Sequence, residues 1–438
     1  MPEDTTIINK QSNISDIDLS SEQQELFERI EETGSNMFIT GKAGTGKSVL
    51  LQYFKENTMK QAVVVAPTGV AALNVRGQTI HSFFKIKPGF IRPEELNLTS
   101  KTALLLRNVD TIIIDEISMV RADLMDGIDH LLRMARSNND PFGGAQIVMF
   151  GDLYQLPPIV DSQGLQQYFA HNHGGYYFFN AHVWENADLE VYELGKIFRQ
   201  KDELFKDILN SIRLGEVTSE HLELLNNRVD LSVPKDGIIT LVTTNNLVRE
   251  INMRRLADLD ESSTDYIADI DGELEESAFP TEEVLILKKG AQVMFLKNDR
   301  EKRWVNGTLG IIDSLSDLEI KVNIDGIIYS VQKETWTKIR YHYDIKTRKV
   351  KEEVVSSFTQ FPLRLAWAIT IHKSQGQTYK LVAINLGGGA FAHGQTYVAL
   401  SRCKSLEGIY LKKRILVQDI IVDPVVVNFM QKVQILRN

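Results

Sequence analysis

The sequence contains a single cysteine, Cys403, among 438 residues. One thiol excludes an internal disulfide framework and any metal site built from several cysteines. Of the nine histidines, none has the spacing of a zinc-binding motif. Long hydrophobic runs are also absent: Val63–Ala66, Ile112–Ile114 and Ile420–Val422 are among the longest, whereas a membrane-spanning helix needs about 20 apolar residues. We therefore expect no membrane partner.

The N-terminus and the overall composition exclude further classes of protein. Met1-Pro2-Glu3-Asp4 is acidic and has no basic stretch followed by an apolar one, so a signal or transit peptide is not indicated and a cytoplasmic location is expected. Hydrophobic residues make up 43% and charged residues 24% of the chain, close to the globular average of about 45–50% and 25%. This composition excludes a disordered, fibrous or coiled-coil chain, and the length indicates about three domains.

Charge is distributed unevenly along the chain. The net charge is −9, but residues 1–286 carry 25 basic and 45 acidic side chains, and residues 287–438 carry 24 basic and 13 acidic ones. Such asymmetry indicates contact with nucleic acid or with a membrane surface. A bipolar protein with solvated charges is the alternative that this feature leaves open.

Short apolar strands alternate with helical segments in the first third of the chain. The strands expected are Met37–Thr40, Val63–Ala66, Thr111–Ile114 and Ile147–Phe150, with helices such as Ser48–Glu56 and Ala122–Ala135 between them. A further amphipathic helix is expected from Leu19, capped by Ser20 or Ser21. A second set of strands follows at Ile239–Thr243, Leu381–Leu386 and Gly408–Leu411. Alternating strands and helices predict two parallel α/β sheets.

Residues 251–359 have a different pattern. Short alternating segments (Gln292–Leu296, Thr308–Ile312, Glu319–Asn323 and Ile327–Val331) are separated by glycine and aspartate turns, which predicts a small antiparallel barrel. The predicted organisation is therefore a tail at 1–18, a first α/β domain at 19–183 with a small insertion at about 85–106, and a second α/β domain formed by 184–250 and 360–438. The barrel, 251–359, interrupts that second domain.

One glycine-rich segment carries a specific chemistry. Gly41-Lys42-Ala43-Gly44-Thr45-Gly46-Lys47-Ser48 matches the phosphate-binding loop G-x-x-x-x-G-K-[ST] in full, between an expected strand and an expected helix. Such a loop directs backbone N–H groups at phosphate oxygens. Lys47 is expected to reach the β- and γ-phosphates, and the hydroxyl of Ser48 to bind Mg²⁺. ATP and Mg²⁺ are the cofactors predicted.

Acidic and amide side chains follow two later strands. Asp115 ends an apolar strand and suits a Mg²⁺ contact, while Glu116 is placed to polarise an attacking water. Gln155 lies in Gly151-Asp152-Leu153-Tyr154-Gln155-Leu156-Pro157-Pro158. It is a candidate sensor of the γ-phosphate, and a polar turn held by two prolines is the equal alternative.

These motifs resemble those of superfamily 1 DNA helicases, and most closely those of the Pif-type branch. Leu19–Gln23 is similar to the adenine-reading Q-motif, Ala66–Ala72 and Thr79–Phe83 to motif Ia and its neighbour, Asp115–Met119 to motif II, and Gly151–Pro158 to motif III. Lys196–Gln200 resembles motif IV, Asp202–Gly215 the signature helix, Phe361–Thr378 motif V, and Gln395–Arg402 motif VI. The resemblance extends from about residue 19 to residue 430.

The resemblance implies two RecA-like domains with ATP in the cleft between them and an SH3-like insertion in the second. It implies arginine fingers at Arg199 and Arg402. Nucleotide contacts are implied at Gln23, Gly41, Ala43, Gly44, Thr45, Gly46, Lys47, Ser48 and Gly376, and single-stranded DNA contacts at Pro67, Thr68, His81, His372 and Lys373. Phe84 is a further candidate for stacking on a base or separating strands, with a place in the core as the alternative.

The function implied is ATP-driven 5′→3′ translocation on single-stranded DNA with duplex unwinding. G-quadruplexes and RNA–DNA hybrids are further possible substrates, in replication, repair, recombination or telomere and genome maintenance. The implied partners are single-stranded DNA and its junctions with duplex, bound by a monomer that associates with the nucleoid if the source is bacterial. Two alternatives remain: an ATP-dependent switch or phosphotransferase, and a DNA clamp whose ATPase only gates affinity.

Overall fold

The computed structural model describes residues 18–436 except 161, 201, 230, 235 and 434. The predicted N-terminal tail therefore lies outside the described residues, apart from Asp18. Within the described part, every helix is too short or too polar to cross a bilayer.

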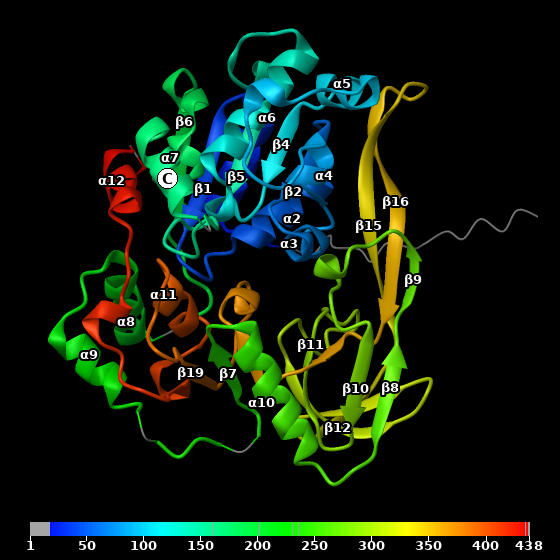
Figure 1. Cartoon of the computed structure of the whole chain (residues 1–438), viewed down its shortest axis with the longest axis vertical. Helices are drawn as coiled ribbons and strands as arrows, with labels where there is room; N and C mark the ends of the chain where they lie inside the picture. Colours follow the sequence, from blue (N-terminus) through cyan, green and yellow to red (C-terminus); the bar gives the residue numbers. More distant parts are fainter. Residues whose placement is uncertain are drawn as a thin grey trace, which may run out of the picture.

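The first domain is built on a parallel sheet with the strand order β21-β6-β1-β5-β4-β2-β3 (Figure 1). Its strands are β1 (Asn36–Gly41), β2 (Ala62–Ala66), β3 (Gln78–Thr79), β4 (Thr111–Ile114), β5 (Gln146–Phe150), β6 (Leu189–Leu194) and β21 (Ile435–Leu436). The accompanying helices are α1 (Ser21–Glu32), α2 (Lys47–Asn57), α3 (Gly69–Asn74), α4 (Ile80–Phe84), α5 (Ser100–Arg107), α6 (Ala122–Arg136) and α7 (Gln163–Asn172). The four strands predicted here are confirmed, as is the helix from Leu19, whose N-cap is Ser20.

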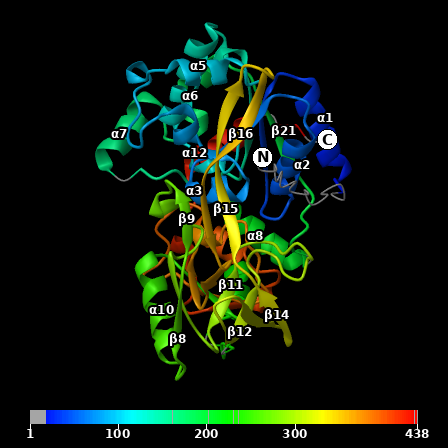
Figure 2. The ribbon, with the colours of Figure 1, turned by 90° about the vertical axis from the view of Figure 1, so that its right-hand side faces the viewer.

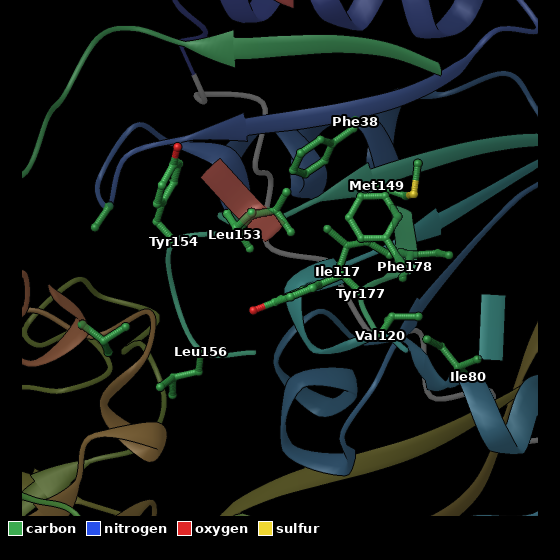
Figure 3. Packing of buried hydrophobic residues seen from close by; sticks show 14 of the residues in the cluster. Phe38, Ile80, Ile117, Val120, Met149, Leu153, Tyr154, Leu156, Tyr177 and Phe178 are labelled. Atoms are coloured by element: carbon green, nitrogen blue, oxygen red, sulfur yellow. The ribbon is translucent and has the colours of Figure 1, made fainter. Parts of the chain in front are cut away.

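Both faces of this sheet are buried, because side chains alternate between two cores. Phe38 and Met149 belong to one core, whereas Met37, Ile39 and Val148 belong to the other. Figure 3 shows Phe38 and Met149 packed with Phe178 on the first face. A sheet covered on both faces needs strands that are apolar at every position. This explains why each of its strands appears in the sequence as a short, uninterrupted run of apolar residues.

The predicted boundary between the first and second domains, after residue 183, is wrong. β6 pairs in parallel with β1 along six positions and therefore belongs to the first sheet. The C-terminal strand β21 also joins this sheet beside β6. Before it, α12 (Pro424–Lys432) places Phe429 on Phe179 with ring centroids 4.0 Å apart. The chain thus returns to the first domain at its end, which sequence patterning alone did not indicate.

The second domain is a smaller parallel sheet with the order β18-β7-β19-β20. Its strands are β7 (Ile239–Val242), β18 (Ala368–Thr370), β19 (Val382–Asn385) and β20 (Ile409–Leu411). Helices of this part of the chain are α8 (Glu203–Leu214), α9 (Ser219–Asn226), α10 (Asn245–Ala257) and α11 (Gln395–Leu400). The prediction of a second parallel α/β domain with a long insertion is confirmed.

The insertion contains only antiparallel strand pairs in its described part. β11 (Gln292–Phe295), β12 (Leu309–Leu315), β13 (Ile320–Ile324), β14 (Ile327–Val331) and β17 (Leu363–Leu365) form one sheet, and β8 (Ser263–Ile267) pairs with β10 (Val284–Lys288). These two sheets share a core that includes Leu285, Val293 and Trp304. The four predicted strands are confirmed, while closure of the sheets into a barrel stays a prediction.

A long hairpin leaves the insertion and reaches the first domain. β15 (Glu334–Asp344) and β16 (Lys349–Gln360), joined at one end by β9 (Asp269–Gly272), run along the side of the molecule as far as α5 (Figures 1 and 2). The hydroxyl of Tyr341 accepts a hydrogen bond from the backbone N–H of Val64 at 3.2 Å. Lys55 of α2 lies 3.0 Å from Glu352. The predicted small insertion at 85–106 includes most of α5, which packs on α6 and on this hairpin.

Candidate nucleotide-binding cleft

A cleft of about 990 Å³ lies between the two α/β domains. Its wall brings together residues that are far apart in the sequence and come from both domains. Every predicted catalytic or nucleotide-binding residue except Gly41 lines it: Gln23, Ala43, Gly44, Thr45, Gly46, Lys47, Ser48, Asp115, Glu116, Gln155, Arg199, Gly376 and Arg402.

The phosphate loop joins β1 to α2 and requires glycine for steric reasons. Gly44 has φ +87°, and a Cβ at this position would lie 2.4 Å from the Cβ of Arg199. At Gly41, φ +149°, a Cβ would lie 2.8 Å from the hydroxyl oxygen of Thr45. The loop can therefore pass close to Arg199 at Gly44, and turn back on Thr45 at Gly41, only because these residues have no side chain.

Lys47 holds its ammonium inside the loop. Its Nζ donates to the carbonyl oxygens of Gly41 at 2.7 Å and Lys42 at 3.1 Å. Burial lowers the pKa of Lys47, against the opposing influence of Asp152 and Glu116. A phosphate would supply the anionic partner that these neutral carbonyls lack.

The two acids after β4 are half-buried and line the cleft. Glu116 has φ 51° and ψ 45°, a left-handed conformation that is rare outside glycine and is often found at functional sites. Burial raises the pKa of Glu116, and burial together with Glu116 raises the pKa of Asp115 to about 7. The carboxylate of Asp115 and the hydroxyl of Ser48 are oxygen donors of the kind that Mg²⁺ prefers, so the residues present fit this ion.

Two arginines, Arg199 and Arg402, form the opposite wall. Arg199 donates to the carbonyl oxygens of Ser401 and Gly376 at 3.2 and 3.3 Å. Arg402 is 1% exposed and donates to the carbonyl of Val398 and the hydroxyl of Ser401. Among the described residues, no carboxylate lies within ion-pair distance of either guanidinium. Burial and the charge of Arg402 lower the pKa of Arg199 to about 9. This wall therefore favours an anion.

A second pair of charges links the two domains and was missed as a functional feature by sequence reasoning. Arg213 of α8 donates to Asp152 at 3.2 Å and lies 3.5 Å from Glu193. The hydroxyl of Tyr397 in α11 accepts from the N–H of Ala43 at 3.1 Å and donates to Asp152 at 3.4 Å. Burial raises the pKa of Asp152, but Arg213 and Lys47 outweigh it, so this pKa lies below its usual value. The motifs contained these residues without indicating that they pair.

Gln23 and Gln155 are both held by neighbours. The side-chain oxygen of Gln23 accepts from the N–H of Ser20 at 3.0 Å, and its Nε2 donates to the carbonyl of Gly46 at 3.2 Å. That nitrogen has two N–H groups, and this bond uses one of them. Gln155 donates to Asp152 and accepts from Gln375, both at 3.4 Å. Gln155 thus connects the cleft to the segment that follows β18.

Phe198 is a further cleft residue that sequence reasoning did not single out, although it lies in the motif IV segment. Its ring is 51% exposed and lines the cleft near Gln23. Its backbone N–H donates to the carbonyl of Gly44 at 2.9 Å. An exposed aromatic face beside the phosphate loop offers a stacking surface for a nucleotide base. Exposure of a large aromatic ring is the signal that identifies it.

The predicted DNA contacts lie where parallel strands end. Pro67 and Thr68 follow β2, and His372 and Lys373 follow β18. His81 lies in α4. Of these five, Lys373 is exposed and the others are half-buried. Burial is the main factor that lowers the pKa of both His81 and His372, so both are neutral at pH 7 and only Lys373 offers a charge for a phosphate.

The prediction that Phe84 contacts DNA is wrong. Its side chain is fully buried, with its ring 4.9 Å from that of Phe83. α4 buries Ile80, Phe83 and Phe84, the i, i+3, i+4 spacing of an apolar helix face. Phe84 therefore belongs to the core of the first domain, the alternative that the sequence left open.

Comparisons with known proteins agree with this geometry. A family model described as PIF1-like helicase matches residues 18–223. The ATP-dependent DNA helicase Pif1 of Bdellovibrio bacteriovorus is 34% identical over 432 residues, which cover 95% of this chain and 92% of that protein. The human ATP-dependent DNA helicase PIF1 is 35% identical over 414 residues, which cover 89% of this chain but only 60% of the human protein.

Solved structures of the Pif1 helicase from a Bacteroides species match most of the chain. The complex with ADP-AlF4 has a TM-score of 0.89 at 40% identity and covers 95% of this chain and 97% of that one. The complex with single-stranded DNA has the same identity and coverage but a TM-score of 0.68. The two parallel sheets described above are accordingly RecA-like P-loop domains.

Replacing Glu116 by glutamine should separate nucleotide binding from turnover. The amide keeps the shape of the side chain but cannot accept a proton from water, so ATP turnover should fall by about 10²–10⁴-fold while ATP still binds. Steady-state hydrolysis and equilibrium titration with a fluorescent ATP analogue measure the two effects. Glu407→Gln, an exposed acid outside the cleft, is the control. Unchanged turnover in Glu116→Gln would remove this residue from the reaction.

Phe198→Ala should weaken ATP binding without altering the phosphate loop. Stacking on a base is worth about 1–3 kcal/mol, so the KM for ATP should rise roughly fivefold or more. Phe198→Tyr keeps the aromatic face and should restore the original KM. A KM that is the same in the alanine variant and the unaltered protein would show that the ring does not contact the base.

Proposed function

The chain belongs to the PIF1-like helicase family of ATP-dependent DNA helicases, and from this premise we propose that it moves 5′→3′ along single-stranded DNA and unwinds the duplex ahead. The observation that carries the proposal is the position of Arg199 and Arg402. Arg199 is half-buried and Arg402 fully buried opposite the phosphate loop, and neither has a carboxylate partner among the described residues. An anion bound in the cleft would be attracted by both domains at once.

The chemistry assigned to the cleft follows from its residues. Lys47 binds the β- and γ-phosphates, exchanging its carbonyl partners for phosphate oxygens. Ser48 and Asp115 hold Mg²⁺, which neutralises charge on the β- and γ-phosphates when bound. Glu116 accepts a proton from the attacking water, and Gln155 positions that water or senses the γ-phosphate. Arg199 and Arg402 stabilise the charge that develops, a contribution of about 10³–10⁵ for an arginine finger.

Contacts between the phosphate loop and the second domain support coupling of hydrolysis to movement. The carbonyl of Gly44 accepts from the N–H of Phe198, and the N–H of Ala43 donates to Tyr397. Loss of the γ-phosphate removes the charge that holds both arginines at the loop. The spacing of the two domains then depends on the nucleotide state, which is the requirement for a motor.

The DNA track is assigned to Pro67, Thr68 and His81 of the first domain and to His372 and Lys373 of the second. The solved complex of Bacteroides Pif1 with single-stranded DNA supports DNA as the ligand. Thr68 uses its hydroxyl to accept from the N–H of Ala71 at the start of α3. Its contribution to the track is therefore to shape the backbone after β2.

The finer assignments extend the family relationship. The 5′→3′ direction, activity on G-quadruplexes and RNA–DNA hybrids, and roles in replication, repair, recombination or telomere and genome maintenance are proposed on the family resemblance. The insertion is proposed to flank the DNA as an SH3-like barrel, through its residues 287–359, which carry 14 basic and 10 acidic side chains. We further propose that the protein acts as a monomer.

Strand displacement on tailed duplexes tests the proposal directly. Two partial duplexes, identical except for a 5′ or a 3′ single-stranded tail, are incubated with ATP and Mg²⁺, and the released strand is measured. Release from the 5′-tailed substrate alone is expected. Release from the 3′-tailed substrate alone would contradict the direction, and DNA-stimulated hydrolysis without release from either would favour a DNA clamp. Hydrolysis that DNA does not stimulate would favour a switch or phosphotransferase.

Lys373→Ala should weaken binding to single-stranded DNA and reduce its salt dependence. Each phosphate contact contributes about 0.7 to the slope of log K against log salt concentration on a single strand, so the slope should fall by about that amount. Lys380→Ala is the matched control, because Lys380 is exposed and paired with Asp325 at 2.6 Å. Equal slopes in the two variants would remove Lys373 from the track.

A further inference from the structure

Three metal-ligating side chains gather in the first domain away from the nucleotide cleft. Asp126 lies in α6, His173 directly follows α7, and His182 begins the 3-10 turn His182–Glu185. One ligand atom from each lies within 4.8 Å of the other two. None of these residues lines the cleft, so this cluster has no part in the ATP site described above.

The carboxylate of Asp126 is oriented by two neighbours. Its Oδ1 accepts from the backbone N–H of Val183 at 3.0 Å, and its Oδ2 lies 3.3 Å from Nε2 of His173. The Val183 contact ties Asp126 to the turn that carries His182. Support of this kind for a carboxylate is typical of residues that hold metal ligands in place.

The two imidazoles differ in exposure. The side chain of His173 is only 5% exposed, and its Nδ1 is buried with no hydrogen-bond partner among the described residues. The side chain of His182 is 55% exposed, and its Nδ1 lies 3.3 Å from a carboxylate oxygen of Glu185. The ring centroids of the two histidines are 4.4 Å apart. Asp126 and His173 are buried, whereas His182 is exposed, so an ion can reach the cluster from solvent on the side of His182.

We propose that Asp126, His173 and His182 bind one divalent transition-metal ion, with zinc as the best match. Two imidazoles and one carboxylate form a donor set that suits Zn²⁺, whereas Mg²⁺ and Ca²⁺ prefer oxygen ligands alone. The rings are inclined by 33°, so binding requires His182 to rotate until its nitrogen points at the ion, which its exposure permits.

Such an ion would join three segments that are otherwise separate in the sequence. α6 would be linked to the end of α7 and to the turn before β6, within the domain that carries the phosphate loop. The expected effect is on the stability of this domain, since a ligand that binds only the folded state stabilises it.

Titration of zinc chloride into the full chain, without nucleotide or Mg²⁺, tests the proposal by isothermal calorimetry and thermal unfolding. One saturable site is expected, and at a zinc concentration 100 times Kd the ratio of folded to unfolded protein should rise about 100-fold. His182→Ala should weaken zinc binding at least about tenfold and reduce the rise in Tm at the same zinc concentration. His171→Ala, an exposed histidine at the end of α7 outside the cluster, should behave like the unaltered protein.

His182 is the position of choice for the substitution because it is exposed, so its loss should not prevent folding. DNA-stimulated ATP hydrolysis with excess Mg²⁺ and a zinc-selective chelator gives an independent check that the variant is folded. The proposal is overturned if no saturable binding occurs. Binding that His182→Ala keeps at full affinity would also overturn it, since the ion would then lie elsewhere.

Discussion

A guanidinium shielded from water without a counter-ion is energetically costly, and this constraint applies at the cleft between the two α/β domains. Arg199 and Arg402 come from segments about 200 residues apart, yet both meet the phosphate loop at the same cleft. Their hydrogen bonds to carbonyl and hydroxyl oxygens satisfy their geometry but leave their positive charge unbalanced. The nucleotide is the missing anion, so the domains are placed to respond to its charge.

The neighbouring Asp152–Arg213 pair shows the contrasting case. Here the buried cation has two carboxylates within 3.5 Å and the ring of Tyr154 at 4.2 Å, so its charge is balanced without a ligand. Tyr397 connects this balanced pair to the phosphate loop. One contact between the domains therefore has its charges balanced, whereas Arg199 and Arg402 face the cleft without a carboxylate partner among the described residues.

Much of the fold could be predicted because its local signals agree. The strands around Met37, Val63, Thr111 and Ile147 are short apolar runs with helices between them, and the structure confirms each. The phosphate loop and the acids after β4 could be predicted for the same reason, because the strand, the loop and the helix that form each of them are contiguous in the chain. Residue roles in catalysis and DNA binding remain predictions, although the predicted nucleotide residues, except for Gly41, share one cleft.

Three features could not be predicted from sequence patterns, because each depends on segments that meet only after folding. In the sequence, Phe84 is a candidate for base stacking with a core position as the favoured alternative, and only the packing of α4 decides for the core. β6 and β21 join the first sheet through pairing across most of the chain, so the domain boundary lies later than expected. The histidines lack the spacing of a zinc-binding motif, yet His173 and His182 lie close to Asp126 in the folded chain.

The sequence by itself determined the helicase family, the phosphate loop and the two parallel sheets, since contiguous residues encode them. Only the tertiary structure decided which distant charges and rings face one another.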